Sequence, residues 1–323
     1  YVLGRAHDDT DTDVISGQAS FGTTDGLTVG GSAAVSLIDK DTQAYIASGA
    51  HVDARGDTAG TITVANGPVS FDFNPVSDVN LAANTIDLNT DGLSTGDEVI
   101  YRSLGGDEID DTLFADLSDE DTYFVRVISP GVVKLYDSQS DAINNVNAID
   151  LDEDNDGSEA TGNFHRLYPT KQGTVPTENI HGLGVEAKAI ELIFSAAAAG
   201  GAGSGVAFTG SLGFMVVDSD TAAFVDKGAI INAEDVNVSA INDARTFGAA
   251  VNLLVGQGTG LGVAGAFDVG LFRNDTNASV NGTVNAEEDV EVHAISRVEV
   301  DSFIAGLGAN SSGISIVASV GLY

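Results

Sequence analysis

Gly205–Ala223 reads GVAFTGSLGFMVVDSDTAA, and two further segments of the chain follow the same pattern. Gly26–Ala44 reads GLTVGGSAAVSLIDKDTQA, and Gly260–Ala278 reads GLGVAGAFDVGLFRNDTNA. Each opens on glycine, has another glycine five residues later, alternates large apolar with small side chains and closes on Asp-Thr-x-Ala. The segments start 179 and 55 residues apart. A repeat of this length predicts an elongated array of stacked units, and it favours a scaffold over an enzyme built around one pocket.

Shorter alternating runs follow the long segments. Residues 49–54, 228–233 and 282–286 each begin with glycine, and two of these runs continue into 234–240 and 288–294. Runs of period two that are separated by Gly, Asn and Asp are typical of strands joined by tight turns. We therefore predict an all-β fold, an elongated β-solenoid or β-helix-like repeat array. In such an array Leu37, Val216 and Leu271 should occupy equivalent interior positions; the alternative is an ordinary β-sandwich.

The longer of the two spacings indicates an insertion. It exceeds the 55-residue unit by 124 residues, and all five prolines of the chain fall in this excess. Strand candidates there are Glu98–Ser103, Thr122–Ile128 and Val132–Asp137, with Pro130-Gly131 as the turn of a hairpin. Three short strands with an apolar face can form a small β-domain. We predict a first part of the array at 1–66, an inserted β-rich module at 67–183 and a second part at 184–323.

The composition limits the class of partner. The 323 residues include 13 Lys and Arg against 48 Asp and Glu, for a formal net charge of −35, and 43% are hydrophobic. So negative a charge repels nucleic acid and anionic lipid, and we expect neither nucleic-acid binding nor membrane insertion. No apolar run reaches the roughly 18 residues of a membrane-spanning helix. The absence of cysteine excludes disulfides and zinc–thiolate sites. It is compatible with the cytosol, but it also suits large secreted bacterial proteins that cross membranes unfolded.

The repeats resemble those of giant bacterial filamentous adhesins, the leukotoxin-like and filamentous-haemagglutinin-like surface proteins. The likeness rests on the small-residue strand, Asp-Thr-x-Ala, Gly-Ala-x-Val-x-Ala and Asp-Val-x-Val-x-Ala, and it covers roughly residues 20–65 and 185–323. The inserted residues 94–101 and 121–125 are similar to small β-modules of other very large surface proteins. The resemblance implies a β-solenoid stalk that is secreted to the bacterial cell surface, with a role in adhesion or in the extracellular matrix of a biofilm.

The ends of the chain suggest how such a segment is used. Residues 1–3 and 314–323 are largely apolar, and both ends interrupt the repeat pattern. The ends of a β-solenoid leave backbone N–H and C=O groups unpaired unless a cap or another strand covers them. We therefore expect this chain to stack end to end with copies of itself or with adjoining repeats.

Two acidic segments have the composition of calcium loops. Asp87, Asn89 and Asp91, followed by Gly92 and Glu98, match the positions of oxygen ligands and glycine in such a loop. Asp152, Asp154 and Asp156 alternate before Gly157, and close carboxylates repel unless a cation neutralises them. We expect Ca²⁺ at one or both segments, where it would stiffen the assembly. The alternative is a solvated acidic turn at the first and a flexible charged loop at the second.

The chain lacks a recognisable catalytic constellation. Its five histidines are scattered and have no partner at metal-ligand spacing, and the glycine-rich stretches are not followed by a phosphate-binding lysine. We therefore predict that the protein is not an enzyme. A glycan- or receptor-binding module carried by the insertion is the alternative to a purely structural segment. A β-helical polysaccharide-degrading enzyme is more remote, because basic residues and Trp are too scarce to hold sugar beside the acids.

Overall fold

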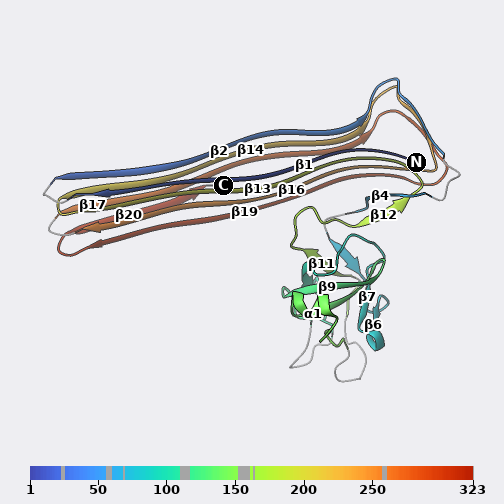
Figure 1. Cartoon of the computed structure of the whole chain (residues 1–323), viewed down its shortest axis with the longest axis horizontal. Coiled ribbons are helices and arrows are strands. Elements are labelled where there is room, and N and C mark those ends of the chain that lie inside the picture. The colour runs from blue at the N-terminus through green and yellow to red at the C-terminus, as the bar shows by residue number, and fades with distance from the viewer. Residues whose placement is uncertain are drawn as a thin grey trace.

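The computed structural model describes residues 1–22, 26–55, 60–67, 70–109, 117–151, 161–162, 164–256 and 260–322. Of these residues 70% lie in strands and 3% in helices, which confirms the all-β prediction. Figure 1 shows a long, flat body of nearly straight strands with a smaller unit beside it. We call the body the blade (residues 1–66 and 176–322) and the smaller unit the lobe (residues 67–175). No helix among the described residues combines the length and the hydropathy needed to span a bilayer.

Three parallel sheets form most of the blade. Sheet A has the order β1-β13-β16-β19, sheet B the order β2-β14-β17-β20, and sheet C places β15 between β3 and β18. The strands of sheet A are β1 (Val2–Phe21), β13 (Gly182–Gly203), β16 (Asp235–Gly256) and β19 (Val290–Asn310). Those of sheet B are β2 (Leu27–Ile46), β14 (Val206–Val225), β17 (Leu261–Val280) and β20 (Ile314–Leu322). The short strands are β3 (His51–Ala54), β15 (Ile230–Ala233) and β18 (Thr283–Ala286), together with β4 (Ile62–Ala65) and β12 (Thr177–Ile180).

The repeat identified in the sequence is the repeat of the strands. The chain runs along sheet A, turns back along sheet B and adds a strand to sheet C. We call one such passage a course, and each course lies beside the one before it (Figure 1). Val216 lies in register with Leu37 on one side and with Leu271 on the other. The predicted equivalence of these three positions is therefore confirmed.

Their predicted interior placement is wrong. Leu37 is 70% exposed and Leu271 is 56% exposed, because these side chains point away from sheet A. The face of sheet B that packs on sheet A carries the small residues instead, including Ala207, Ser211 and Ala264. The two sheets approach so closely that a Cβ added at Gly201 would lie 2.4 Å from the Thr209 methyl group. Close packing of this kind leaves room between the sheets for only some large side chains, such as Ile193, Met215 and Val217, and most other large side chains of sheet B lie on the outer face.

The Asp-Thr-x-Ala motif has a structural explanation in the same alternation. In β2 and β14 its threonine and its last alanine are buried between the sheets, whereas its aspartate is exposed. Beyond this motif sheet C joins sheets A and B around a larger core. That core includes Val185, Val225, Ile231 and Val238, all fully buried. The Asp-Thr-x-Ala motif therefore lies where the two-layer stack of sheets A and B becomes a three-sided core closed by sheet C.

The lobe is a seven-stranded antiparallel sheet with the order β5-β11-β8-β9-β10-β7-β6. Its core contains Phe71, Phe73, Tyr101, Val125 and Leu167, all nearly inaccessible to water. The predicted strands at 98–103, 122–128 and 132–137 are confirmed, and the hairpin turns at Pro130-Gly131 with φ +71° at the glycine. The elements are β5 (Phe71–Phe73), β6 (Val79–Asn80), a 3₁₀ helix (Leu81–Ala83), β7 (Thr85–Asp87), β8 (Glu98–Arg102), β9 (Thr122–Ser129), β10 (Val132–Tyr136), α1 (Gln139–Asn144) and β11 (His165–Pro169).

The chain leaves the blade and returns to it at one place. β4 pairs antiparallel with β12, so that Ala65 lies opposite Thr177, and the Asn66 N–H donates to the Pro176 carbonyl at 2.8 Å. The blade therefore resumes at residue 176, before the predicted boundary at 183. The physical reason is that β12 completes a ladder with the strand that precedes the lobe.

Candidate functional site

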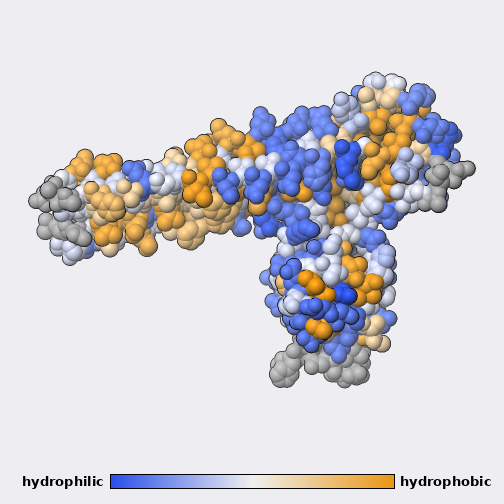
Figure 2. Space-filling view, viewed as in Figure 1, coloured by the Kyte–Doolittle hydropathy of each residue, from blue (hydrophilic) through white to orange (hydrophobic). Residues whose placement is uncertain are grey.

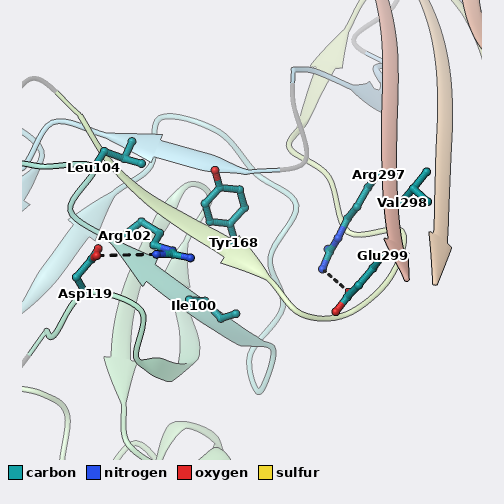
Figure 3. Close-up of a pocket in the computed structure, with 8 residues that line it drawn as sticks. All are labelled: Ile100, Arg102, Leu104, Asp119, Tyr168, Arg297, Val298 and Glu299. Carbon is teal, nitrogen blue, oxygen red and sulfur yellow. Dashed lines mark ion pairs between the residues drawn. The ribbon is translucent and has the colours of Figure 1, made fainter. Parts of the chain in front are cut away.

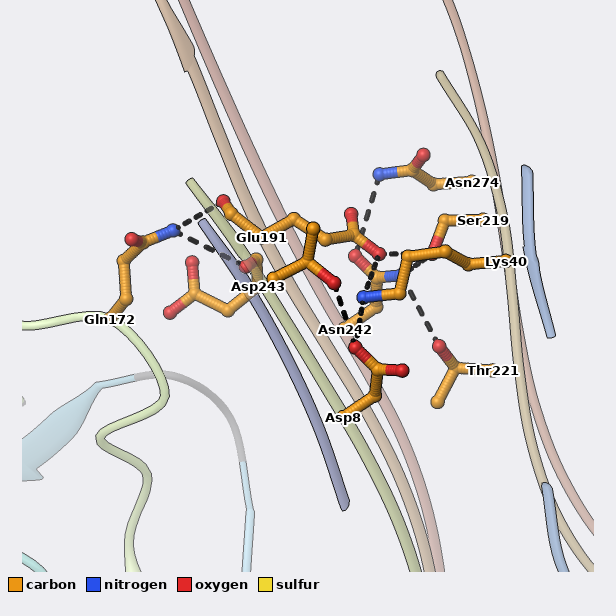
Figure 4. Close-up of polar contacts among 10 residues, drawn as sticks. Asp8, Lys40, Gln172, Glu191, Ser219, Thr221, Asn242, Asp243 and Asn274 are labelled. Carbon is orange, nitrogen blue, oxygen red and sulfur yellow. Dashed lines mark hydrogen bonds and ion pairs between the residues drawn. The ribbon is translucent and has the colours of Figure 1, made fainter. Parts of the chain in front are cut away.

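A buried polar cluster lies between sheets A and B (Figure 4). Glu191 of β13 is fully buried, and the Lys40 ammonium of β2 lies 3.3 Å from it and 2.6 Å from Asp8 of β1. The hydroxyl of Ser219 donates to Glu191 at 2.5 Å, and the Asn242 amide donates to Ser219 at 3.0 Å. Lys40 holds the pKa of Asp8 below its usual value, mainly through a hydrogen bond. The cluster links three courses of the blade, and its one ammonium faces two carboxylates.

The lobe is fastened to the outer face of sheet A by the loop that follows β11. The Gln172 side chain donates to the Glu191 carbonyl at 2.9 Å, and the Gly173 N–H donates to the Asp243 carboxylate at 2.6 Å (Figure 4). Arg245 donates to the Thr170 carbonyl at 2.9 Å. Arg297, on the same face of sheet A, donates to the Pro169 carbonyl at 2.8 Å. Charge-assisted hydrogen bonds of this kind hold the loop in one position.

A cavity of about 510 Å³ lies in the seam between the lobe and β19 (Figure 3). Tyr168 and Arg102 face it from the lobe, and Arg297 faces it from the blade. Each arginine has an acidic partner: Arg102 pairs with Glu120, and Arg297 lies 3.7 Å from Glu299. The remaining lining residues are Ile100, Leu104, Asp119, Val298 and Glu299. An aromatic ring among paired charges offers stacking and hydrogen bonds to a ligand that is itself uncharged.

An acidic hollow of about 200 Å³ lies at the other side of the junction, between β12 and β19. Burial, together with the neighbouring Glu291, raises the pKa of Glu178 to about 7. The pKa of Glu291 is lowered: burial opposes the change, while hydrogen bonds from Glu178 and His293 favour the ionised form. The two carboxyl groups thus share a proton near neutral pH. Asp235, Glu288 and Asp289 also line this hollow.

The first predicted calcium segment is not gathered into one site. Asp87 ends β7, and its carboxylate accepts from the Asn89 N–H at 2.9 Å, which closes a tight turn. Asp91 uses its backbone to pair with Thr177. Glu98 begins β8, which β9 and β10 separate from β7 in the sheet, a distance of about 14 Å at the usual strand spacing. Calcium binding by this segment stays a prediction. It would require Glu98 to lie closer to Asp87 than it does in this structure.

The second predicted calcium segment, Asp152, Asp154 and Asp156, lies outside the described residues. Leu151, just before it, is buried in the core of the lobe. Across the ranges that the structure describes, no three acidic or histidine side chains lie together in a geometry that could hold a metal ion. Calcium binding by the second segment therefore also stays a prediction.

Two open sheet edges are the largest feature of the blade that could bind another chain. β1 and β2 form one edge of sheets A and B, and β19 and β20 form the opposite edge. Within the described ranges no strand pairs with the outer side of any of the four. The edges of sheet A are 20 and 21 residues long. Unpaired N–H and C=O groups in such a row are a template for a further strand.

No family model, curated protein or solved structure matches this chain. The cavity, the hollow and the Lys40 cluster were all missed by the sequence analysis. Each joins residues from strands that are far apart in the chain, and no local motif marks them. The sequence repeat covers β2, β14 and β17 but gives no register for β1, so it could not show that Asp8 lies near Lys40 and Glu191.

Proposed function

We propose that this chain is a structural segment of an extracellular bacterial filament or giant adhesin stalk. In this proposal the blade is a β-solenoid, the lobe is a module inserted between its first and second courses, and courses continue end to end. The observation that carries the proposal is the pair of open edges, which have the same strand direction and, in sheet A, nearly the same length. A further parallel strand can therefore add at either side, from adjoining repeats or from a second copy of the chain.

The backbone direction at the β19 edge allows a specific test. Val236 lies opposite Val290, yet its N–H donates to the Asp289 carbonyl at 2.9 Å. In a parallel ladder without a register shift, alternate residues of a strand face the same neighbour. The odd-numbered residues of β19 therefore face β16, and even-numbered residues such as Val300 direct their N–H groups toward the open edge.

We expect Val300→Pro to remove a donor from the open edge without removing a hydrogen bond inside the blade. The wild-type chain should show concentration-dependent rods by sedimentation velocity and electron microscopy. Val300→Pro should shorten or abolish these rods while its far-ultraviolet circular dichroism is unchanged. The matched control, Val300→Thr, keeps the N–H and the branched Cβ and should stack like the wild type. Rods of equal length in all three proteins would reject stacking through this edge.

A second candidate function is favoured by the seam cavity, namely recognition of a glycan by the lobe. Tyr168 can stack on a sugar ring, while Arg102 and Arg297 can donate to its hydroxyl groups. Glycan-array binding that is lost in Tyr168→Ala but kept in the surface control Phe164→Ala would support it. Equal binding by both variants would place recognition elsewhere.

A further inference from the structure

The half of the blade where sheet A turns into sheet B is almost free of charge. We call it the distal half; its described residues are 14–22, 27–38, 192–217, 246–256, 260–272 and 302–322. It contains one charged side chain, Asp268, which is only 2% exposed. The whole chain has a net charge of −35, so this segregation is strong. Figure 2 shows apolar residues over this end of the blade and hydrophilic ones over its middle.

Large apolar side chains cover the outer face of sheet B in the distal half. Leu27, Val29, Phe208, Leu271 and Ile316 are between 41% and 68% exposed. Isolated exposed apolar residues are common on proteins, but a continuous face of them marks a contact surface. The lobe is fastened to sheet A, so it leaves this face of sheet B uncovered.

A lane without large side chains crosses this face at right angles to the strands. Gly31, Gly210 and Gly265 are in register, and Ala318 continues the row on β20. A Cβ added at these glycines would meet only ordinary contacts, none closer than 3.4 Å. The fold of the chain therefore does not require glycine at these positions. Glycine also weakens a strand, and it is often found where another backbone or ligand comes close.

A ridge runs beside the lane. Its members are Val29, Phe208, Val263 and Ile316, which lie in register two residues before the lane. The row on the other side of the lane consists of Ala33, Leu212, Phe267 and Val320, of which the last three are between 41% and 47% exposed. Neighbouring rows on one face are about 6.7 Å apart, since two residues of a strand span that distance. A ridge and a lane at this separation are complementary in shape to a second copy of themselves.

We propose that the distal faces of sheet B from two copies of this chain pack against each other. A two-fold axis that lies in the plane of the interface, parallel to the rows and midway between ridge and lane, places the ridge of each copy in the lane of the other. The same axis makes the blades antiparallel, so that the acidic halves extend in opposite directions and do not face each other. This lateral contact is separate from stacking through the strand edges.

The area of the face fits a specific interface. Four strands at about 4.8 Å spacing and about ten residues at 3.3 Å each cover about 600 Å² per copy. Two copies would then bury about 1,200 Å², at the lower end of the range of about 1,200–2,000 Å² for stable interfaces. A lipid surface fits less well, because the acidic half of the blade would be repelled by anionic headgroups.

The test uses Val300→Pro chains, in which edge stacking is blocked, and adds Gly210→Val to fill the lane. Filling the lane should weaken lateral association at least tenfold by sedimentation velocity, while the thermal midpoint of the monomer is kept or raised. The matched control is Gly17→Val on the outer face of sheet A, where an added Cβ meets nothing within 4 Å. It should associate like its parent.

Three results would overturn the inference. The first is that the parent, the Val300→Pro chain, stays monomeric at high concentration. The second is that Gly210→Val and Gly17→Val associate equally. The third is that the parent forms no dimers but floats with phosphatidylcholine vesicles. If the parent is monomeric while the wild type forms rods, edge stacking stands and the lateral contact is rejected. If wild type and parent both form dimers only, the lateral contact stands and edge stacking is rejected.

Discussion

Lys40 carries the positive charge of the buried cluster between sheets A and B. Its side chain is 10% exposed and compensates the fully buried Glu191. We expect Lys40→Met to cost about 3–5 kcal/mol, since it leaves a buried carboxylate without its cation. The double variant Lys40→Met/Glu191→Gln should recover most of that loss, as measured by urea unfolding. A single variant as stable as the wild type would show that water already reaches Glu191.

Glu178 makes stability depend on pH. Its pKa rises from 4.5 to about 7 on folding, so the folded protein holds a proton that the unfolded chain releases. Stability is therefore lost as pH rises from 4.5 to 7. The carboxyl is only partly buried and solvent screens it, so we expect a loss of only about 1 kcal/mol.

In Glu178→Gln the proton-linked loss should disappear, and the variant should unfold at a higher temperature than the wild type at pH 8 but not at pH 4. Glu287→Gln removes an exposed carboxylate at the same end of the blade and serves as the control. Parallel pH profiles for wild type and Glu178→Gln would mean that Glu291 does not share a proton with this residue.

At the scale of elements, the β4–β12 ladder makes the lobe removable. Ala65 and Thr177 face each other, so a two-residue Asn-Gly turn can join them in place of residues 66–176. The shortened chain should keep the parallel sheets and lose about 1–3 kcal/mol, because Arg245 and Asp243 lose their partners in the loop. Circular dichroism and thermal unfolding measure both effects. Loss of the β-sheet circular dichroism of the shortened chain would mean that the lobe is needed for the first course of the blade to pair with the second.

The lobe should also fold when it is expressed alone as residues 67–175. It has its own apolar core and its own antiparallel sheet, and the blade supplies none of its core residues. A cooperative thermal transition and dispersed amide resonances are expected. A narrow amide spectrum typical of a disordered chain would show that the lobe needs the contacts between the loop after β11 and sheet A in order to fold.

At the scale of the whole molecule, the net charge predicts a strong dependence on salt. Parallel register stacks Asp41, Asp220 and Asp275 into one exposed column of like charge. Raising sodium chloride from about 10 to 150 mM shortens the screening length from about 30 to 8 Å and should raise the thermal midpoint by several degrees.

Calcium is tested at constant ionic strength. If the predicted sites exist, 1 mM Ca²⁺ should raise the midpoint further, and a chelator should reverse the change. Replacing Asp152, Asp154 and Asp156 by Asn should remove the part due to the second segment. If Ca²⁺ raises the thermal midpoint no more than sodium does, charge screening alone explains the change and the predicted calcium sites are rejected.

The sequence alone determined the repeat, its register and the hairpin in the lobe. These features are local: matching segments in a chain align when strands stack in parallel, and Pro130-Gly131 is adjacent to both strands that it joins. The seam cavity and the Glu178–Glu291 pair could not be predicted, because their members come from strands more than a hundred residues apart. Only the tertiary structure decided which face of each long strand is inside. A period of two shows that the faces differ, but not which one meets another sheet. In this blade the close approach of sheets A and B near Gly201 and Ala264 leaves room for few large side chains, of which Leu254 is one, so most of the others lie outside.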